Sequence, residues 1–406
     1  MTPQGTSPLL AGGRTLLASS LLARLPLAML SIALLVHVQR LTGSFAIAGA
    51  ACSAYAICGA LASPVLGRTI DRRGQTGVLV IGGALTALAL IGMGLFPADS
   101  PPALAVALAG VTGLATPPVG ACVRTLLPAI VSRPSELPAL FALESTLLEV
   151  TFVLGPPLAL GLGAAWSTGA ALVVSGLLMG AGALAFATRR ASRSWRPDAS
   201  VTRSRSGSLR AAAIRVLVIV DMGTGVVFGA TEVGVTAGAK HVAGAAAAGP
   251  LLGVWGAGSL IGGLVVTRLG ARFQGAKLLP VLLGALALTH GALPAGAGCL
   301  PVMGAIILLA GATIAPTGAA IYAMVDRFAP AGTQTEAFSW LFTSASTGAA
   351  AGAAIGGILA QSTGPAAVFA FAGVAGGLAT LVAVLGSQHL TPRQPSAQAR
   401  IAHQFG

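Results

Sequence analysis

The sequence predicts an all-α integral membrane protein with twelve transmembrane helices arranged as two pseudo-symmetric six-helix bundles. Composition, the spacing of charged residues and an internal repeat lead to this fold class. Hydrophobic residues make up 55% of the 406 residues and charged residues only 8%. Soluble proteins carry roughly 25% charged residues, so this chain has too few charges for a soluble globular fold, which is excluded. Disorder would need low hydrophobicity, and the continuous apolar runs lack the alternation of a β-barrel.

Gaps between charged residues locate the spans, because a helix needs about 20 mostly apolar residues to cross about 30 Å of hydrocarbon. Residues 41 to 67 and 74 to 98, for example, contain no Asp, Glu, Lys or Arg. Gly and Pro clusters divide the longer gaps into two spans each. The predicted helices lie near 15–39, 45–66, 77–96, 102–125, 137–161, 166–188, 214–237, 247–267, 278–296, 301–324, 336–360 and 365–387.

The basic residues predict that both termini are cytoplasmic, since Lys and Arg are retained on the cytoplasmic side of short loops. With this orientation only Arg40 and Lys240 fall in outside loops, Arg24 and Arg124 fall within spans, and the other 19 of 23 lie inside. We therefore interpret the net charge of +13 as an orientation signal, with anionic lipid as a further partner and no nucleic acid. We expect a monomer in the plasma membrane.

An internal repeat supports two related halves. Residues 1–188 form the predicted N-terminal bundle, 189–213 a basic cytoplasmic linker, 214–387 the C-terminal bundle and 388–406 a cytoplasmic tail. Gly67, Arg72 and Gly74 recur 196 residues later as Gly263, Arg268 and Gly270. A second echo, 198 residues apart, matches Gly113, Pro118, Gly120 and Ala121 with Gly311, Pro316, Gly318 and Ala319. Such repeats are typical of transporters that bind solute near the bilayer midplane.

The turn after the second span resembles a known family signature. Gly67, Asp71, Arg72 and Gly74, followed by Gln75-Thr-Gly-Val-Leu79, resemble the loop motif Gly-x-Leu-Ala-Asp-Arg-x-Gly-Arg-Lys of the major facilitator superfamily. The resemblance implies the fold of that superfamily and a conformational latch at this loop, with Arg268 and Gly270 as its degenerate copy. The latch is favoured over a purely topogenic loop, because Asp71 can accept hydrogen bonds from a helix N-terminus and Gly74 permits a tight turn.

The fifth span carries Gly155-Pro156, which resembles the core of a motif associated with drug and metabolite antiporters of that superfamily. Pro156 removes a backbone hydrogen bond, which predicts a helix kink at this pair. The resemblance implies the drug and metabolite efflux branch of the superfamily.

Ionisable residues inside spans are candidate proton or substrate sites, because each costs roughly 2.5–3.5 kcal/mol to insert. They are Arg24, Glu144, Glu149, Asp221 and Glu232. Asp221 and Glu232 are eleven positions apart and therefore share a helix face. A carboxyl group withdrawn from water can hold a proton at neutral pH, which favours Glu149 and Asp221 as carriers. The alternative is a structural ion pair, for instance between Arg24 and one of the acids.

These features predict a secondary transporter that exports a small organic molecule in exchange for protons. Proton-linked uptake and, less favoured, a non-transporting sensor are the alternatives. The sequence contains neither a nucleotide-binding Gly-x-x-x-x-Gly-Lys-Ser/Thr loop nor a nucleophile or zinc-protease motif, so we expect no enzyme and no cofactor. The four cysteines have no metal-ligand spacing, so no metal site is expected.

Overall fold

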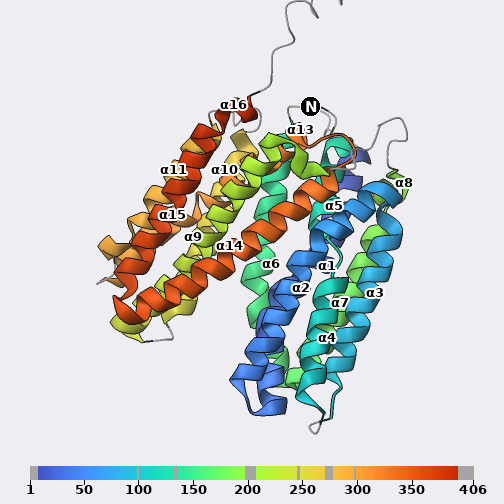
Figure 1. Cartoon of the computed structure of the whole chain (residues 1–406), viewed down its shortest axis with the longest axis horizontal. Helices are drawn as coiled ribbons and strands as arrows, with labels where there is room; N and C mark the ends of the chain where they lie inside the picture. Colours follow the sequence, from blue (N-terminus) through green and yellow to red (C-terminus); the bar gives the residue numbers. More distant parts are fainter. Residues whose placement is uncertain are drawn as a thin grey trace, which may run out of the picture.

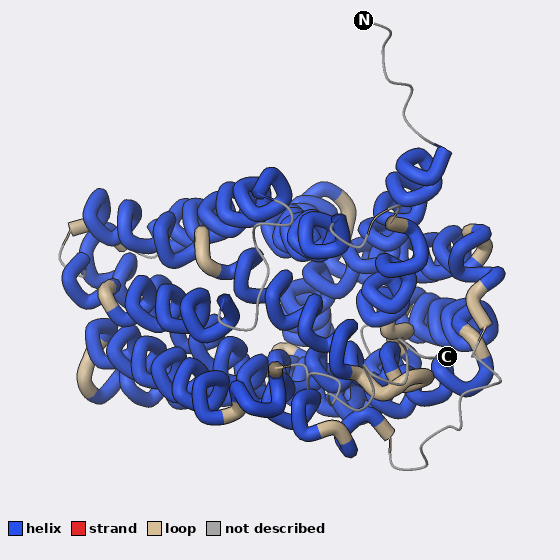
Figure 2. The backbone as a smooth tube through the Cα atoms, turned by 90° about the horizontal axis from the view of Figure 1, so that it is seen from above, coloured by secondary structure: helices blue, strands red, loops and turns tan. Residues whose placement is uncertain are grey.

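The computed structural model describes residues 8–97, 100–131, 133, 136–196, 207–244, 247–269, 278–296 and 299–391. Figure 2 shows these residues as helices and connecting loops, without a strand. The described residues contain twelve segments that are long and apolar enough to cross a membrane, which confirms the predicted number of spans.

The helices follow one another with short connections. The first six spans are α1 (Pro8–Thr42), α2 (Phe45–Arg73), α3 (Gln75–Gly94), α4 (Pro102–Ala115) with α5 (Val119–Ile130), α6 (Leu137–Ala165) and α7 (Thr168–Ala187). The last six are α9 (Ala212–Ala243), α10 (Ala248–Leu269), α11 (Leu278–Gly291) with the 3-10 turn η5 (Leu293–Gly296), α12 (Leu300–Gly311) with α13 (Ile314–Phe328), α14 (Gln334–Ser362) and α15 (Pro365–Leu385). Arg40 and Lys240, expected in loops, lie near the ends of α1 and α9.

Spans four and ten differ from the prediction, because each is two helices rather than one. The breaks follow Ala115 and Gly311, at equivalent places in the two halves. Pro118 and Pro316 stand at the start of the second helix in each pair, where a proline lacks the N–H needed to continue the preceding helix. The second echo of the sequence repeat therefore marks a shared break.

Large apolar side chains are exposed along the spans. Leu61, Leu88 and Leu288 expose 68%, 67% and 75% of their surface. Extended apolar surface of this kind is rare on soluble monomers and suits contact with lipid.

The predicted linker is partly helical. It contains α8 (Arg190–Ser194) and the 3-10 turn η2 (Ser208–Arg210), while residues 197–206 lie outside the described part. In the predicted tail, α16 (Ser387–Leu390) precedes residues 392–406, which also lie outside it. The linker thus begins and ends with ordered turns next to the bundles.

Helices α1 to α7 pack mainly on one another, and α9 to α15 do the same (Figure 1). Between the two groups, α2 packs on α14, while α6 packs on α10 and α13. In Figure 1 the groups converge at the top and diverge towards the bottom. We call the top the closed end; it contains the C-terminus of α2 and the N-terminus of α14.

Glycines make the crossings between the groups possible. A Cβ atom at Gly67 of α2 would meet Ser339 and Thr335 of α14, and one at Gly263 of α10 would overlap Thr146 of α6. The first sequence echo therefore places a glycine at two pseudo-equivalent crossings. Within the second group, Gly348, Gly352 and Gly356 let α14 approach the backbone of α9 closely.

Candidate functional site

A buried ion-pair network joins three helices of the first group. Glu144 of α6 lies between Arg24 of α1 and Arg124 of α5. Its Oε1 accepts a hydrogen bond from Arg24 Nη1 at 2.6 Å, and its Oε2 accepts one from Arg124 Nε at 3.1 Å. All three side chains are buried. Arg24 and Glu144 therefore form the structural ion pair that the sequence analysis gave as the alternative. Both carboxylate oxygens of Glu144 accept hydrogen bonds from guanidinium groups.

Tyr322 of α13 connects this network to the second group of helices. The Arg124 guanidinium carbon lies 3.8 Å from the centre of the Tyr322 ring, a cation–π contact. The ring also packs against Phe141 of α6 and Phe338 of α14, with centroids 6.4 and 6.3 Å away. Sequence reasoning missed Tyr322. The available signal was its rarity, since the chain has only two tyrosines.

Asp221 of α9 lies near the same network. Its carboxylate oxygens are each 3.4 Å from a hydroxyl, that of Thr224 on the same helix and that of Ser344 on α14. Asp221 is buried, and its contact with Ser344 joins α9 to α14.

Glu149 of α6 is the unpaired acid of this region. It is half-buried, and no hydrogen-bond or ion-pair partner occurs for it in the described part of the chain. Glu149 follows Ser145 by four residues and so shares its helix face, which turns towards Gly318 of α13. The carboxyl group thus lies on the side of α6 that faces the other group of helices.

The charges in this region do not balance if every group is ionised. We call Arg24, Arg124, Glu144, Glu149 and Asp221 the central cluster. It contains two guanidinium groups and three carboxyl groups. Because unbalanced charge in a poorly solvated region is costly, binding one proton on a carboxyl group would restore neutrality.

Glu232 has a different environment from Asp221, although both are on one face of α9. Glu232 is exposed, whereas Asp221 is buried. A helical wheel gives the direction of a side chain around the helix axis. It does not show which neighbours surround that side chain at its position along the helix. Glu232 is therefore not part of the central cluster.

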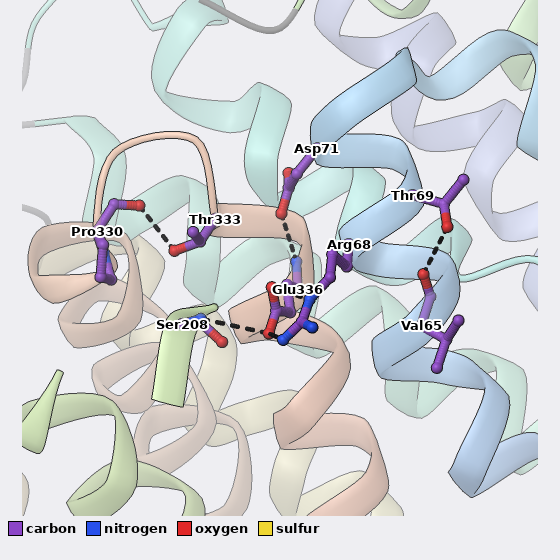
Figure 3. A network of polar contacts seen from close by, with 8 residues as sticks. All are labelled: Val65, Arg68, Thr69, Asp71, Ser208, Pro330, Thr333 and Glu336. Atoms are coloured by element: carbon purple, nitrogen blue, oxygen red, sulfur yellow. Dashed lines mark hydrogen bonds and ion pairs between the residues drawn. The ribbon is translucent and has the colours of Figure 1, made fainter. Parts of the chain in front are cut away.

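The C-terminal turns of α2 are attached to α14 at the closed end (Figure 3). Asp71 Oδ1 accepts a hydrogen bond from the backbone N–H of Thr335 at 3.1 Å. Its Oδ2 accepts one from the backbone N–H of Glu336 at 2.8 Å (Figure 3). These N–H groups belong to the first turn of α14, which lacks a side-chain cap from its own N-cap residue. Asp71 is buried and supplies the missing acceptors from the other half of the chain.

A second contact, missed from the sequence, lies beside Asp71. Arg68 donates to both Glu336 carboxylate oxygens, at 2.8 and 3.0 Å, and the backbone N–H of Ser208 donates to Oε1 at 3.3 Å (Figure 3). Arg68 lies about one helical turn before Asp71 and so on the same face of α2. This spacing was the signal that could have placed Arg68 beside the latch. Arg72, expected in the latch, is exposed and has no partner among the described residues.

The loop with Gly74 and its second copy at Arg268 and Gly270 differ in structure. Gly74 has φ +96° and separates α2 from α3, which favours glycine there. In the second half, Arg268 is exposed without a described partner, and Gly270 lies outside the described residues. Thr267 occupies the position equivalent to Asp71 and donates to Gly263 of its own helix at 2.8 Å. The carboxylate contact is therefore found in the first half only.

The Gly155-Pro156 pair lies within α6, whose helix continues through it from Leu137 to Ala165. A Cβ atom at Gly155 would meet the side chain and backbone of Ala28 on α1. Gly155 therefore permits close packing of α1 and α6, while the kink and its role in transport stay predictions.

Metal ligands do not gather in the described part of the chain: it contains no group of three or more His, Cys, Asp or Glu side chains that could hold an ion.

Two helical groups, a polar cluster between them and contacts at one end define a membrane protein of transporter architecture. The chain belongs to the Major Facilitator Superfamily, whose family model matches residues 16–334. The BT1 family model also matches residues 277–404. No curated protein sequence matches the chain.

Solved structures of low sequence identity share the fold. A bacterial homologue of the iron transporter ferroportin in an outward-facing state superposes with a TM-score of 0.77 at 18% identity, covering 93% of this chain and 99% of that one. The human organic anion transporter MFSD10 (TETRAN) has a TM-score of 0.70 at 16% identity, covering 95% of this chain and 100% of that one. These likenesses confirm the predicted fold class.

Proposed function

We propose that this protein is a secondary active transporter that exports a small organic molecule in exchange for protons. Alternating access would occur by rocking of the two six-helix bundles around the central cluster. The observation that carries the proposal is the unequal number of charges there, two guanidinium groups against three carboxyl groups, with Glu149 unpaired.

In the proposed cycle, Glu149 is the proton carrier and Asp221 contributes to the proton or substrate pathway. Glu144 has a different role, because its two arginine partners fix its charge and hold α1, α5 and α6 together. Removal of the Glu149 proton adds a negative charge between the bundles. That change favours either rebinding of a proton or arrival of a cationic group, and so couples the two fluxes.

The contacts between the two halves, at the closed end and at the central cluster, would have to break when access changes. They include the hydrogen bonds of Asp71 to α14 and the stacking of Arg124 on Tyr322. Both contacts join the two halves of the chain, so their free energy belongs to the state in which this end is closed. We infer that the state described here opens to the side opposite the cytoplasm.

Transport in cells tests the proposal. A panel of labelled small molecules is offered to cells that express the full chain, with and without a protonophore. The panel includes organic anions and iron, because the two structures of similar fold are named for such solutes. If the protein is an exporter, at least one compound accumulates less in cells that express the chain, and its accumulation recovers when the protonophore is added.

Two variants make the test specific. Glu149→Gln removes the titratable group while keeping the shape of the side chain, and we expect it to abolish the response to the proton gradient. Glu232→Gln is the matched control, since it makes the same change at an exposed position of α9. Accumulation that rises on expression would instead establish uptake. Unchanged proton dependence in Glu149→Gln would exclude this residue as the carrier.

A further inference from the structure

A basic hollow lies at the closed end, on the outer side of the first bundle, away from the central cluster. It has a volume of about 350 Å³ and is lined by Arg73, Gly74, Gln75, Thr76, Gly77, Arg193 and Arg196. These residues come from the turn between α2 and α3 and from the linker helix α8 with the residues after it. Figure 1 shows α8 beside the first turn of α3, and the two helices are in contact.

The first turn of α3 presents backbone donors to this hollow. The helix has 20 residues, and its N-cap residue, Gly74, has no side chain that could accept a hydrogen bond. The first N–H groups of a helix have no partner within the helix, and they carry the positive end of its dipole. Such a terminus attracts an anion.

Gln75 provides an independent indication of a ligand. Its side chain is only 1% exposed although it lines the hollow, so it forms the inner wall. The Ser192 hydroxyl donates to Gln75 Oε1 at 3.0 Å, which orients the amide group. The amide nitrogen, Nε2, has no hydrogen-bond partner within the described part of the chain. A buried donor without an acceptor is unfavourable, and an oxyanion would supply the acceptor.

The rim of the hollow is positively charged. Arg73, Arg193 and Arg196 are exposed, and none of them forms an ion pair with a described carboxylate. Arg196 Nη1 donates to the carbonyl oxygens of Arg193 and Trp195, at 2.6 and 3.0 Å, so its guanidinium group is held in place. Among the described residues, no acidic side chain lines the hollow.

We propose that this hollow binds a phosphate group, presented either by an anionic lipid headgroup of the cytoplasmic leaflet or by a soluble phosphate compound. Guanidinium groups, helix N-terminal N–H groups and the Gln75 amide all donate hydrogen bonds to oxygen, and phosphate accepts several at once. The bound group would hold α8 of the linker against the turn that carries Asp71. The site is independent of the solute that the protein transports.

Binding to the purified full-length chain tests this site in two arms. In detergent without added lipid, equilibrium dialysis measures radiolabelled inorganic phosphate. In parallel, native mass spectrometry measures phosphatidylglycerol, with phosphatidylcholine as the zwitterionic control. Saturable binding of phosphate, of phosphatidylglycerol or of both supports the site, and the arm that binds identifies the source.

The variant Arg193→Gln/Arg196→Gln should weaken binding about tenfold or more, because each cationic side chain near a phosphate contributes measurably to affinity. Arg189→Gln/Arg190→Gln is the matched control, since it removes the same charge from exposed neighbours outside the hollow. Gln75→Glu keeps the size and the Ser192 contact but repels an anion, and should also weaken binding. Gel filtration and thermal unfolding monitor folding of each variant.

The proposal is overturned if neither ligand binds saturably to the wild-type chain. It is also overturned if the control double variant loses as much affinity as Arg193→Gln/Arg196→Gln, because the effect would then reflect net charge alone. The arginine variants alter exposed positions, so they decide the question even if Gln75→Glu does not fold.

Discussion

Replacing Asp71 by Asn isolates the contact between the two halves at the closed end. The wild-type carboxylate accepts two backbone hydrogen bonds from the first turn of α14, at 3.1 and 2.8 Å. Asn keeps one neutral acceptor and turns the other oxygen into a donor that faces an N–H group. Hydrogen bonds to charged groups contribute about 1.5–3 kcal/mol each, and the favourable charge at a helix N-terminus about 0.3–1 kcal/mol.

We therefore expect the Asn variant to lose about 2–3 kcal/mol of stabilisation of the closed end relative to its open form. At about 1.4 kcal/mol per tenfold change, the population ratio shifts by roughly 30- to 150-fold. The hydrogen bonds of Arg68 to Glu336 remain in this variant. Because Arg68 is 41% exposed, solvent limits their contribution to about 1 kcal/mol or less, so they cannot compensate fully.

Double electron–electron resonance, which measures the distance between two spin labels, detects this shift. Spin labels at Arg189 and Arg327, exposed positions at the closed end of the two bundles, report their separation after the native cysteines are replaced. Asp71→Asn should add a population at longer distance. Arg72→Gln is the control, because Arg72 is exposed and has no described partner. An unchanged distance distribution in Asp71→Asn, or an equal change in both variants, would refute the latch.

Three further predictions concern the central cluster and the helix crossings. Glu144→Gln leaves two buried guanidinium groups without their carboxylate, so we expect a loss of about 3–5 kcal/mol in the free energy of unfolding; denaturant unfolding in detergent checks this, and a stable variant would contradict the structural role. Tyr322→Leu should weaken the closed end by about 0.5–2 kcal/mol through loss of the Arg124 contact, whereas Tyr322→Phe, which keeps the ring, should resemble the wild type in the same spin-label distances. Gly352→Leu should lower thermal stability markedly, since a side chain there would overlap the backbone of α9, while Gly357→Leu, where nothing is near, serves as its control.

The membrane class and the number of spans could be predicted because they depend on local properties. Length and apolar content of a segment decide whether it can cross a bilayer, whatever its neighbours are. The repeated glycines were also visible in the sequence. They fall at pseudo-equivalent crossings, where Gly67 of α2 meets α14 and Gly263 of α10 meets α6. The second echo lies at the breaks within spans four and ten, but sequence reasoning predicted one continuous helix for each of these spans.

The partners of the charged residues could not be predicted. Helix periodicity placed Asp71 and Arg68 on α2, but their contacts lie more than 260 residues away on α14. The same is true of Arg124, whose guanidinium group stacks on Tyr322 in the other half of the chain. Such pairs depend on how two bundles meet, and no local pattern contains that information.

The sequence by itself determined that this chain inserts as twelve helices in two related halves, because hydrophobic length, loop charge and repeated small residues act on each segment separately. Only the tertiary structure decided which acids are paired and which is free. Glu144 and Glu149 are five residues apart on α6, yet one lies between two arginines and the other has no described partner. The difference arises because a turn of about 140° around the helix directs each carboxyl group to a different neighbour.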